Sequence, residues 1–176
     1  MTRITRNEHI VNLQGTSVHQ NQIFLLLEFC AFGSVASFLK HNASYYRQCI
    51  SNNDYEFLLR CCTQVASGMD FLVGKEVIHS DLAARNVLIT SDMTIKLADF
   101  GLSQRMYMKL GDRKGPRSEK VPVLYSAIEV LRADHAVLEY SDVWSYAVYV
   151  WEIFQLCLAK PYVGVSGGKL KKRLLR

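Results

Sequence analysis

Hydrophobic and polar residues along the chain are spaced in a way that predicts both strands and helices. The run Ile23–Leu27 is continuously apolar, which predicts a short buried strand. A short helix ending near Lys40 should follow, and the polar stretch 41–53 is expected to be a connector. Segments 87–90 and 94–97 flank a Ser-Asp-Met turn, a pattern typical of a β-hairpin.

Two further segments have the pattern of helices. Apolar residues recur at three- and four-residue steps at Leu58, Cys61, Val65, Met69 and Leu72, which predicts an amphipathic helix. Ser51 followed by Asp54 resembles a capping box at its start. The run Val143–Ala159 is apolar on nearly every face and should begin at Tyr140 or Ser141 and end before Pro161.

The apolar run 143–159 is better explained as a buried central helix than as a membrane span. A transmembrane helix needs ~20 apolar residues. This run is shorter and carries the polar residues Ser145, Glu152 and Gln155. No membrane segment is therefore expected in this chain.

Composition narrows the class of protein. The 176 residues predict about one domain, and 49% hydrophobic with 21% charged residues is ordinary for a globular fold. The net charge is +5, and five basic residues lie in the last eight positions. The rest of the chain is thus nearly neutral, which argues against a nucleic-acid-binding surface. The polar, basic segment 103–121 is expected to be a mobile loop.

The five cysteines indicate a reducing environment. Their number is odd and no two have C-x-x-C spacing, so neither a disulfide framework nor a zinc site is expected. The first residues contain no apolar signal sequence. These features predict a cytoplasmic location.

Two motifs carry the chemical information. His79-Ser80-Asp81-Leu82-Ala83-Ala84-Arg85-Asn86 precedes Asp99-Phe100-Gly101, with the predicted hairpin between them. Here the chain resembles the protein tyrosine kinases, whose catalytic loop reads H-R-D-L-A-A-R-N and whose metal-binding loop reads D-F-G. Each motif alone is weak, but their order and spacing together are specific.

The resemblance covers nearly the whole chain. It extends to Asn12–Gly15, to Leu26–Cys30 as a fifth strand and hinge, and to Ser141–Tyr146 and Trp151–Ile153 in the family's central helix. Gly68–Leu72 and the hinge favour the receptor-type members. The implied fold class is α+β: residues 1–30 form the remainder of a small β lobe with the hinge, and residues 31–176 form most of a helical large lobe, incomplete at its C-terminus.

The resemblance also implies a reaction and the residues that perform it. Asp81 would accept a hydrogen bond from the substrate hydroxyl, while Arg85 would serve the catalytic loop and the substrate side. Asn86 and Asp99 would bind Mg²⁺ through oxygen atoms. ATP would contact the hinge at Glu28 and Cys30, with Leu88 as the floor of the adenine pocket, Leu27 as gatekeeper and Asp99 near the phosphates.

The substrate class follows from two positions of the same loop. Serine/threonine kinases usually have lysine two residues after the catalytic aspartate, where this chain has Ala83, and Arg85 matches the tyrosine kinases. The implied partners are ATP and proteins that carry a substrate tyrosine. Tyr107 is a candidate phosphorylation site in the polar loop, and an exposed tyrosine without a regulatory role is the alternative.

The chain also departs from the family pattern. Its resemblance starts near the end of the family's C helix, so a glycine-rich loop and the ATP-contacting lysine would lie upstream. Ser80 replaces the arginine of H-R-D, and the segment Pro122–Glu129 lacks the basic residue, the tryptophan and the second proline of P-V-[KR]-W-x-A-P-E. Three alternatives stay open: a tyrosine kinase domain, on the cytoplasmic side of the plasma membrane if it belongs to a receptor, a catalytically weak or dead kinase-like module, and an unstable gene fragment.

Overall fold

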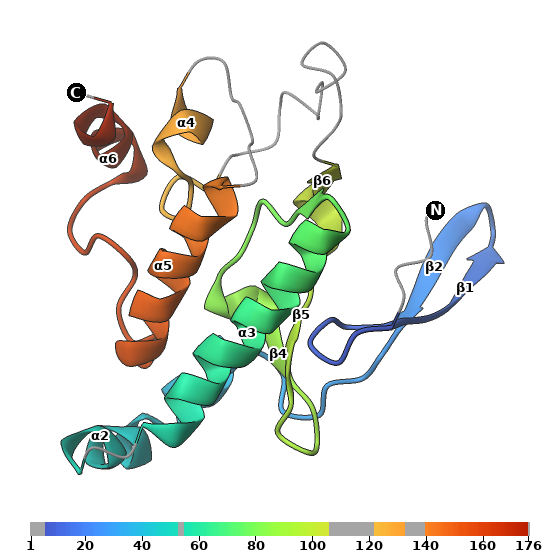
Figure 1. The fold of residues 1–176 in the computed structure, drawn as a ribbon, viewed down its shortest axis with the longest axis horizontal. Helices are drawn as coiled ribbons and strands as arrows, with labels where there is room; N and C mark the ends of the chain where they lie inside the picture. Colours follow the sequence, from blue (N-terminus) through green and yellow to red (C-terminus); the bar gives the residue numbers. More distant parts are fainter. Residues whose placement is uncertain (1–5, 53–54, 106–121, 133–139, 176) are drawn as a thin grey trace.

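The first element of the fold is an antiparallel hairpin. The computed structural model describes residues 6–52, 55–105, 122–132 and 140–175. Strand β1 (Leu13–His19) pairs with β2 (Gln22–Leu27) through Gln20 and Asn21, which both have positive φ. Such a turn matches the natural twist of the two strands. In Figure 1 the hairpin projects away from the helices.

The predicted strand at Ile23–Leu27 is confirmed, but its predicted burial is wrong. Every residue of β2 is exposed. Among the described elements, β1 is the only strand that pairs with β2, and no described element covers either face of the pair. A continuous apolar run predicts a strand correctly, but it carries no information about the layer that would bury it.

The first helices surround an aromatic cluster. Helix α1 (Val35–His41) confirms the short predicted helix, whereas the segment predicted as a connector forms α2 (Ala43–Ser51). The reason is Tyr46, which is buried with its ring centroid 6.3 Å from that of Phe38 and 5.4 Å from that of Phe57. Packing of this one aromatic side chain stabilises α2. The polar composition of the segment alone does not predict a helix.

Helix α3 (Glu56–Gly74) confirms the predicted amphipathic helix and lies at the centre of the fold. Its buried residues are Leu58, Cys61, Cys62, Val65, Gly68 and Leu72. The predicted N-cap at Ser51 is wrong, because Ser51 ends α2 and the N-cap of α3 is Tyr55. Asp54, the other residue of the predicted capping box, lies outside the described residues.

Helix α5 (Ser141–Phe154) packs beside α3 (Figure 1). The hydroxyl groups of Tyr146 and Tyr149 donate to backbone carbonyls of α3, at 3.1 and 3.0 Å. The helix ends well before Pro161, earlier than predicted, because Leu156 and Cys157 have positive φ values that a right-handed helix cannot continue through.

Burial of α5 is one-sided rather than complete. Tyr149 and Ile153 are fully buried, whereas Val143 and Trp151 on the other side are exposed. The predicted central helix is therefore confirmed, but its burial is limited to one side. No helix in the described part of the chain has the length and apolar character needed to cross a bilayer.

Short strands support the motif-bearing loops. The predicted hairpin is confirmed as β4 (Val87–Ile89) paired with β5 (Ile95–Leu97). Strand β3 (Val77–Ile78) pairs with β6 (Gln104–Arg105), at the start of the predicted mobile loop, and residues 106–121 of that loop lie outside the described part.

The remaining described elements are short. They are the 3₁₀ turns η1 (Ala84–Asn86) and η2 (Phe100–Leu102) and the helices α4 (Ile128–Leu131) and α6 (Gly167–Leu174). Helix α6 forms from the glycine- and lysine-rich end of the chain, for which the hydrophobic pattern predicts no element. The α+β class is confirmed.

Candidate active site

The motif segment 79–86 is held to the start of α5 through its backbone. The N–H groups of His79 and Ser80 donate to the two carboxylate oxygens of Asp142, at 2.7 and 3.0 Å. Ser80 has a φ of 68°, in the left-handed region that costs a non-glycine residue roughly 1–2 kcal/mol. Burial raises the pKa of the Asp142 carboxyl, and the two N–H groups oppose this effect.

His79 links this segment to the metal-loop motif. Its Nε2 lies 3.1 Å from the carbonyl oxygen of Ala98, and its Nδ1 lies 3.3 Å from the backbone nitrogen of Asp81. A neutral imidazole with its proton on Nε2 satisfies both contacts. Burial lowers the pKa of His79, against the opposing influence of Asp142. The ring also packs against Phe100, with centroids 5.1 Å apart.

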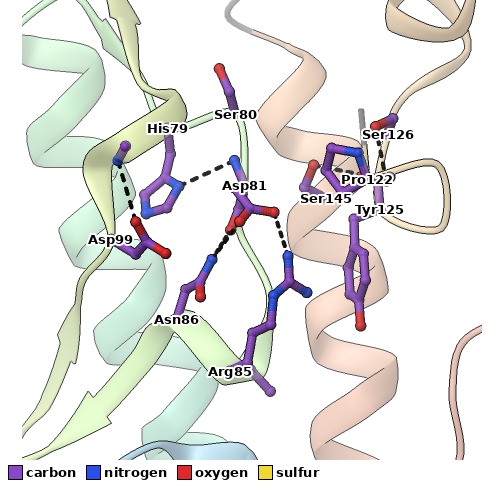
Figure 2. Close-up of polar contacts among 12 residues, drawn as sticks. His79, Ser80, Asp81, Arg85, Asn86, Asp99, Pro122, Tyr125, Ser126 and Ser145 are labelled. Atoms are coloured by element: carbon purple, nitrogen blue, oxygen red, sulfur yellow. Dashed lines mark hydrogen bonds and ion pairs between the residues drawn. The ribbon is translucent and has the colours of Figure 1, made fainter. Parts of the chain in front are cut away.

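Asp81 lies at the centre of Figure 2, with both carboxylate oxygens engaged. Arg85 Nη2 donates to Oδ1 at 2.5 Å, and Asn86 Nδ2 donates to Oδ2 at 2.8 Å. The side chain is 13% exposed, so the carboxylate still reaches solvent. Donors on both sides fix its plane, while the oxygens keep lone pairs for an incoming hydroxyl.

Asn86 and Asp99 present oxygen atoms at the same end of the β4–β5 hairpin. Asn86 Nδ2 also donates to the Asp81 carbonyl at 2.7 Å, so both amide protons are used. The backbone carbonyl of Asn86 accepts a hydrogen bond from the backbone N–H of Ala98 at 2.9 Å. This bond places Asp99, the next residue, beside Asn86. Figure 2 shows the Asp99 side chain on the Asn86 side of the loop.

The side-chain oxygens of Asn86 and Asp99 are ligands of a kind that suits Mg²⁺. The cation prefers oxygen ligands and usually binds through one or two protein side chains, completing its shell with water and phosphate. Asp99 is exposed and has a φ of 59°, and its Oδ1 accepts from the Gly101 N–H at 3.4 Å. Within the described residues, no three His, Cys, Asp or Glu side chains form a metal-binding group.

The predicted adenine-contacting residues lie at the junction of the hairpin and the helices. Cys30 is buried with Val11 and Ala98, and Leu88 packs against them. The Glu28 N–H donates to the Asn12 carbonyl, and the Cys30 carbonyl accepts from the Gly33 N–H. Among the described residues, the Glu28 carbonyl and the Cys30 N–H have no hydrogen-bond partner.

Glu28 is further fixed by its side chain. Lys96 Nζ lies 2.8 Å from its Oε1, and Asn12 Nδ2 donates to its Oε2 at 2.9 Å. Burial alone would raise the pKa of Glu28, but these hydrogen bonds outweigh it and the net pKa is lowered. Leu27, the predicted gatekeeper, ends β2 and is exposed, so the structure does not bring its side chain to the buried Cys30 cluster.

The structure adds Tyr125 and Glu152, which sequence reasoning missed. The Tyr125 hydroxyl donates to Glu152 Oε1 at 2.7 Å, and the Ala84 N–H donates to Oε2 at 3.0 Å. The Arg85 guanidinium lies over the Tyr125 ring, 4.8 Å from its centroid. A signal for Glu152 was present: a carboxylate inside an apolar helix must be paired when it is buried.

The structure describes one of two further positions singled out in the sequence, Ser80 and Tyr107. Ser80 Oγ is enclosed and, among the described residues, has no hydrogen-bond partner. Tyr107 lies outside the described residues.

Comparisons with known proteins agree with the motifs. The sequence model of the family described as protein tyrosine and serine/threonine kinase matches residues 1–176. The chain is 36% identical to fibroblast growth factor receptor 1 of Xenopus laevis over 99% of its own length and 22% of that protein. It is also 36% identical to a fibroblast growth factor receptor of Hydra vulgaris, over 97% of its length and 21% of the relative. The chain thus spans about a fifth of these curated relatives, and it belongs to the protein tyrosine and serine/threonine kinase family.

Proposed function

We propose that this chain forms the catalytic part of a protein tyrosine kinase, which transfers the γ-phosphate of ATP to tyrosine hydroxyls of proteins. The observation that carries the proposal is the Asp81 carboxylate, held between Arg85 and Asn86 and open to solvent. Asp99 lies alongside on the adjoining loop (Figure 2). Phosphoryl transfer depends mainly on positioning and charge neutralisation, which this arrangement supplies.

The chain's residues divide the work of the reaction. Asp81 accepts a hydrogen bond from the substrate hydroxyl, orients its oxygen toward the γ-phosphorus and takes the proton as the new P–O bond forms and ADP leaves. Arg85 and Asn86 hold the carboxylate in place. Asn86 and Asp99 would hold Mg²⁺, which neutralises charge on the phosphates when bound.

The hinge would receive the adenine. The Glu28 carbonyl is an acceptor and the Cys30 N–H a donor, so together they match the edge of the base, which offers both. Leu88 and the buried cluster around Cys30 provide an apolar floor. Leu27 would border the pocket as gatekeeper, which requires a cover over β2 that the described residues do not provide.

Tyrosine as the acceptor is supported by the catalytic loop. Position 83 is alanine, where serine/threonine kinases usually have lysine, and Arg85 lies four residues after Asp81, as in tyrosine kinases. The similar relatives are receptors by name. These names support the proposal that the domain belongs to a receptor and lies on the cytoplasmic side of the plasma membrane.

Ser80 favours a second candidate, a kinase-like module with little or no transfer activity. In the family an arginine at this position pairs with a phosphorylated activation loop. Serine is uncharged, so it cannot pair with a phosphate as an arginine does, and the Ser80 hydroxyl is enclosed without a partner among the described residues. Under this alternative Tyr107 would be an exposed tyrosine without a regulatory role.

The test is transfer of ³²P from ATP to a tyrosine peptide by the gene product that contains this chain. Asp81→Asn is nearly isosteric but removes the negative acceptor, so activity should fall by roughly 10²–10⁴-fold. Asp99→Asn should lower the apparent affinity for Mg²⁺, so excess Mg²⁺ should partly restore its rate. Asp70→Asn, an exposed change on α3, is the matched control.

The outcomes separate the candidates. Wild-type turnover in Asp81→Asn would exclude Asp81 as the base. No transfer by a wild-type protein that unfolds cooperatively would favour the non-catalytic module. No cooperative unfolding transition would support the unstable fragment.

A further inference from the structure

A closed ring of contacts ties the catalytic loop to α5. Ala84 and Arg85 are neighbours in η1, Arg85 lies over the Tyr125 ring, Tyr125 donates to Glu152, and Glu152 accepts from the Ala84 N–H. The loop is thus attached at two adjacent residues. Tyr125 is the member of the ring that comes from neither the loop nor the helix, and Figure 2 shows it facing Arg85.

The ring depends on a buried carboxylate. Glu152 is 7% exposed, and its two oxygens accept from the Tyr125 hydroxyl and the Ala84 N–H. A buried charge is stable only when its hydrogen-bonding capacity is filled. Glu152 therefore fixes the position of the Tyr125 ring. The Tyr125 carbonyl strengthens this by accepting from Ser145 Oγ at 2.8 Å.

The Tyr125 hydroxyl remains a donor at ordinary pH. Burial raises the pKa of Tyr125, and the hydrogen bond to Glu152 and the charge of that carboxylate raise it further. The ring face is then a fixed platform for Arg85, whose side chain is 44% exposed and would otherwise be free to change rotamer. A guanidinium stacks favourably on an aromatic face.

We propose that Tyr125 is a positioning residue for the transfer reaction: it fixes Arg85, and through Arg85 the plane of the Asp81 carboxylate. Arg85 supplies one of the two donors to that carboxylate. Without the platform, Arg85 leaves Asp81 Oδ1 for part of the time, and Asp81 samples orientations that do not point at the substrate hydroxyl. This inference rests on the phosphotransfer proposed above.

The first experiment uses NMR to measure the environment and the motion of the Arg85 side chain directly. The Nε–Hε resonance of Arg85, assigned by its disappearance in Arg85→Lys, should show a ring-current shift and restricted motion in the ¹⁵N-labelled protein. Tyr125→Leu should abolish both features. The matched control is Tyr146→Phe. This change on α5 also removes a tyrosine hydroxyl, whose hydrogen bond goes to the Cys62 carbonyl and not to the catalytic loop. An unshifted, mobile Arg85 in the wild type would overturn the proposal.

The second experiment measures transfer. Tyr125→Leu should lower kcat by roughly 10–100-fold, since small displacements of a catalytic group have effects of this order, with the KM for ATP unchanged. Tyr125→Phe should have a smaller effect because it keeps the ring. Tyr125→Trp keeps an aromatic face and an N–H donor and should restore most of kcat. A kcat for Tyr125→Leu equal to that of the wild type would overturn the proposal.

Circular dichroism of each variant identifies loss of folding. If Tyr125→Leu does not fold, Tyr125→Phe and Tyr125→Trp decide the question: equal kcat values in these two variants would contradict it. Absence of transfer in the wild type is a failure of the proposed function and is seen before any variant is made. The Arg85 resonance then still decides whether Tyr125 fixes Arg85.

Discussion

The β1–β2 hairpin and the α3–α5 centre are built from similar apolar residues but differ in what surrounds them. Leu25 in β2 is 54% exposed, whereas Leu97 in β5 is fully buried against α3. Both are leucines in antiparallel strands. Only the second removes its side chain from water, and burial of a leucine contributes about 1.5–3 kcal/mol.

The difference shows where the site gets its rigidity. Asp142 and Glu152 reach the catalytic loop from α5, and Tyr149 joins α5 to α3. The hairpin is attached to this centre through β5, where Lys96 pairs with Glu28 and the Leu97 carbonyl accepts from the Val11 N–H. The proposed catalytic residues are therefore anchored in the core, whereas the proposed nucleotide-binding residues lie beside a less buried element.

The sharpest test compares the same substitution in the two regions. Leu97→Ala should lower the free energy of unfolding by about 2–5 kcal/mol, because it leaves a cavity in a closely packed core. Leu25→Ala should change it by less than about 0.5 kcal/mol, because water already surrounds the side chain. Urea denaturation measures both, and equal losses would show that the hairpin is covered in solution.

The same contrast explains which sequence predictions hold. Helix α3 and the β4–β5 hairpin were predictable because their periodicity is imposed by the core that they pack against. The strand in β2 was predictable, but its burial was not, since a partner layer leaves no mark in a local pattern. Helix α2 depends on the packing of Tyr46, and the end of α5 depends on the backbone conformation at Leu156. The spacing of apolar residues reveals neither.

For the candidate site, motif order predicted Asp81, Asn86 and Asp99, and Figure 2 shows these residues close together. Motif order could not identify Asp142, because the loop backbone that Asp142 holds is more than sixty residues away in the chain. Tyr125 was even less accessible to sequence reasoning: comparison with the family pattern showed only a lost tryptophan. Its contacts with Arg85 and Glu152 exist only in three dimensions.

Glycine substitutions give a second matched pair. A Cβ at Gly68 in α3 would lie 2.9 Å from the His9 backbone carbonyl and 2.8 Å from Leu97 Cδ1, whereas one at Gly15 in β1 would meet nothing within 4 Å. Gly68→Ala gains about 1 kcal/mol of helix propensity, but the backbone contact cannot relax easily. We expect a net loss of about 1–2 kcal/mol. Gly15→Ala should be nearly neutral, and thermal denaturation of the pair tests this.

Alkaline pH should weaken the core through its thiols. Burial raises the pKa of Cys62 to about 11 and of Cys157 to about 12. Because the folded pKa values lie above the unfolded value of about 8.5, stability is complete below that pH and declines as the pH rises toward the folded values. Each of these thiols should account for about 1 kcal/mol lost by pH 9.5.

The measurement is the urea midpoint between pH 7.5 and 9.5. Cys157→Ala should reduce the pH-dependent loss by about one thiol's share, whereas Cys49→Ala, at a partly exposed position, is the control. The hairpin contains no cysteine, so the alkaline loss should be insensitive to substitutions there. A decline unchanged in Cys157→Ala would contradict this assignment to the interior.

The smallest expected effect compares two residues that have left-handed backbone conformations, Ser80 in the core-anchored loop and Asn21 in the hairpin turn. Glycine adopts this conformation without strain, so both changes relieve some of it, offset by the greater freedom of glycine in the unfolded chain. Ser80→Gly also removes an enclosed hydroxyl that has no partner among the described residues. It should therefore stabilise the protein by up to about 1 kcal/mol, and Asn21→Gly by less. Ser80→Ala separates the two causes, since it removes the hydroxyl but keeps the strain; if it is as stabilising as Ser80→Gly in urea denaturation, the hydroxyl and not the backbone is responsible.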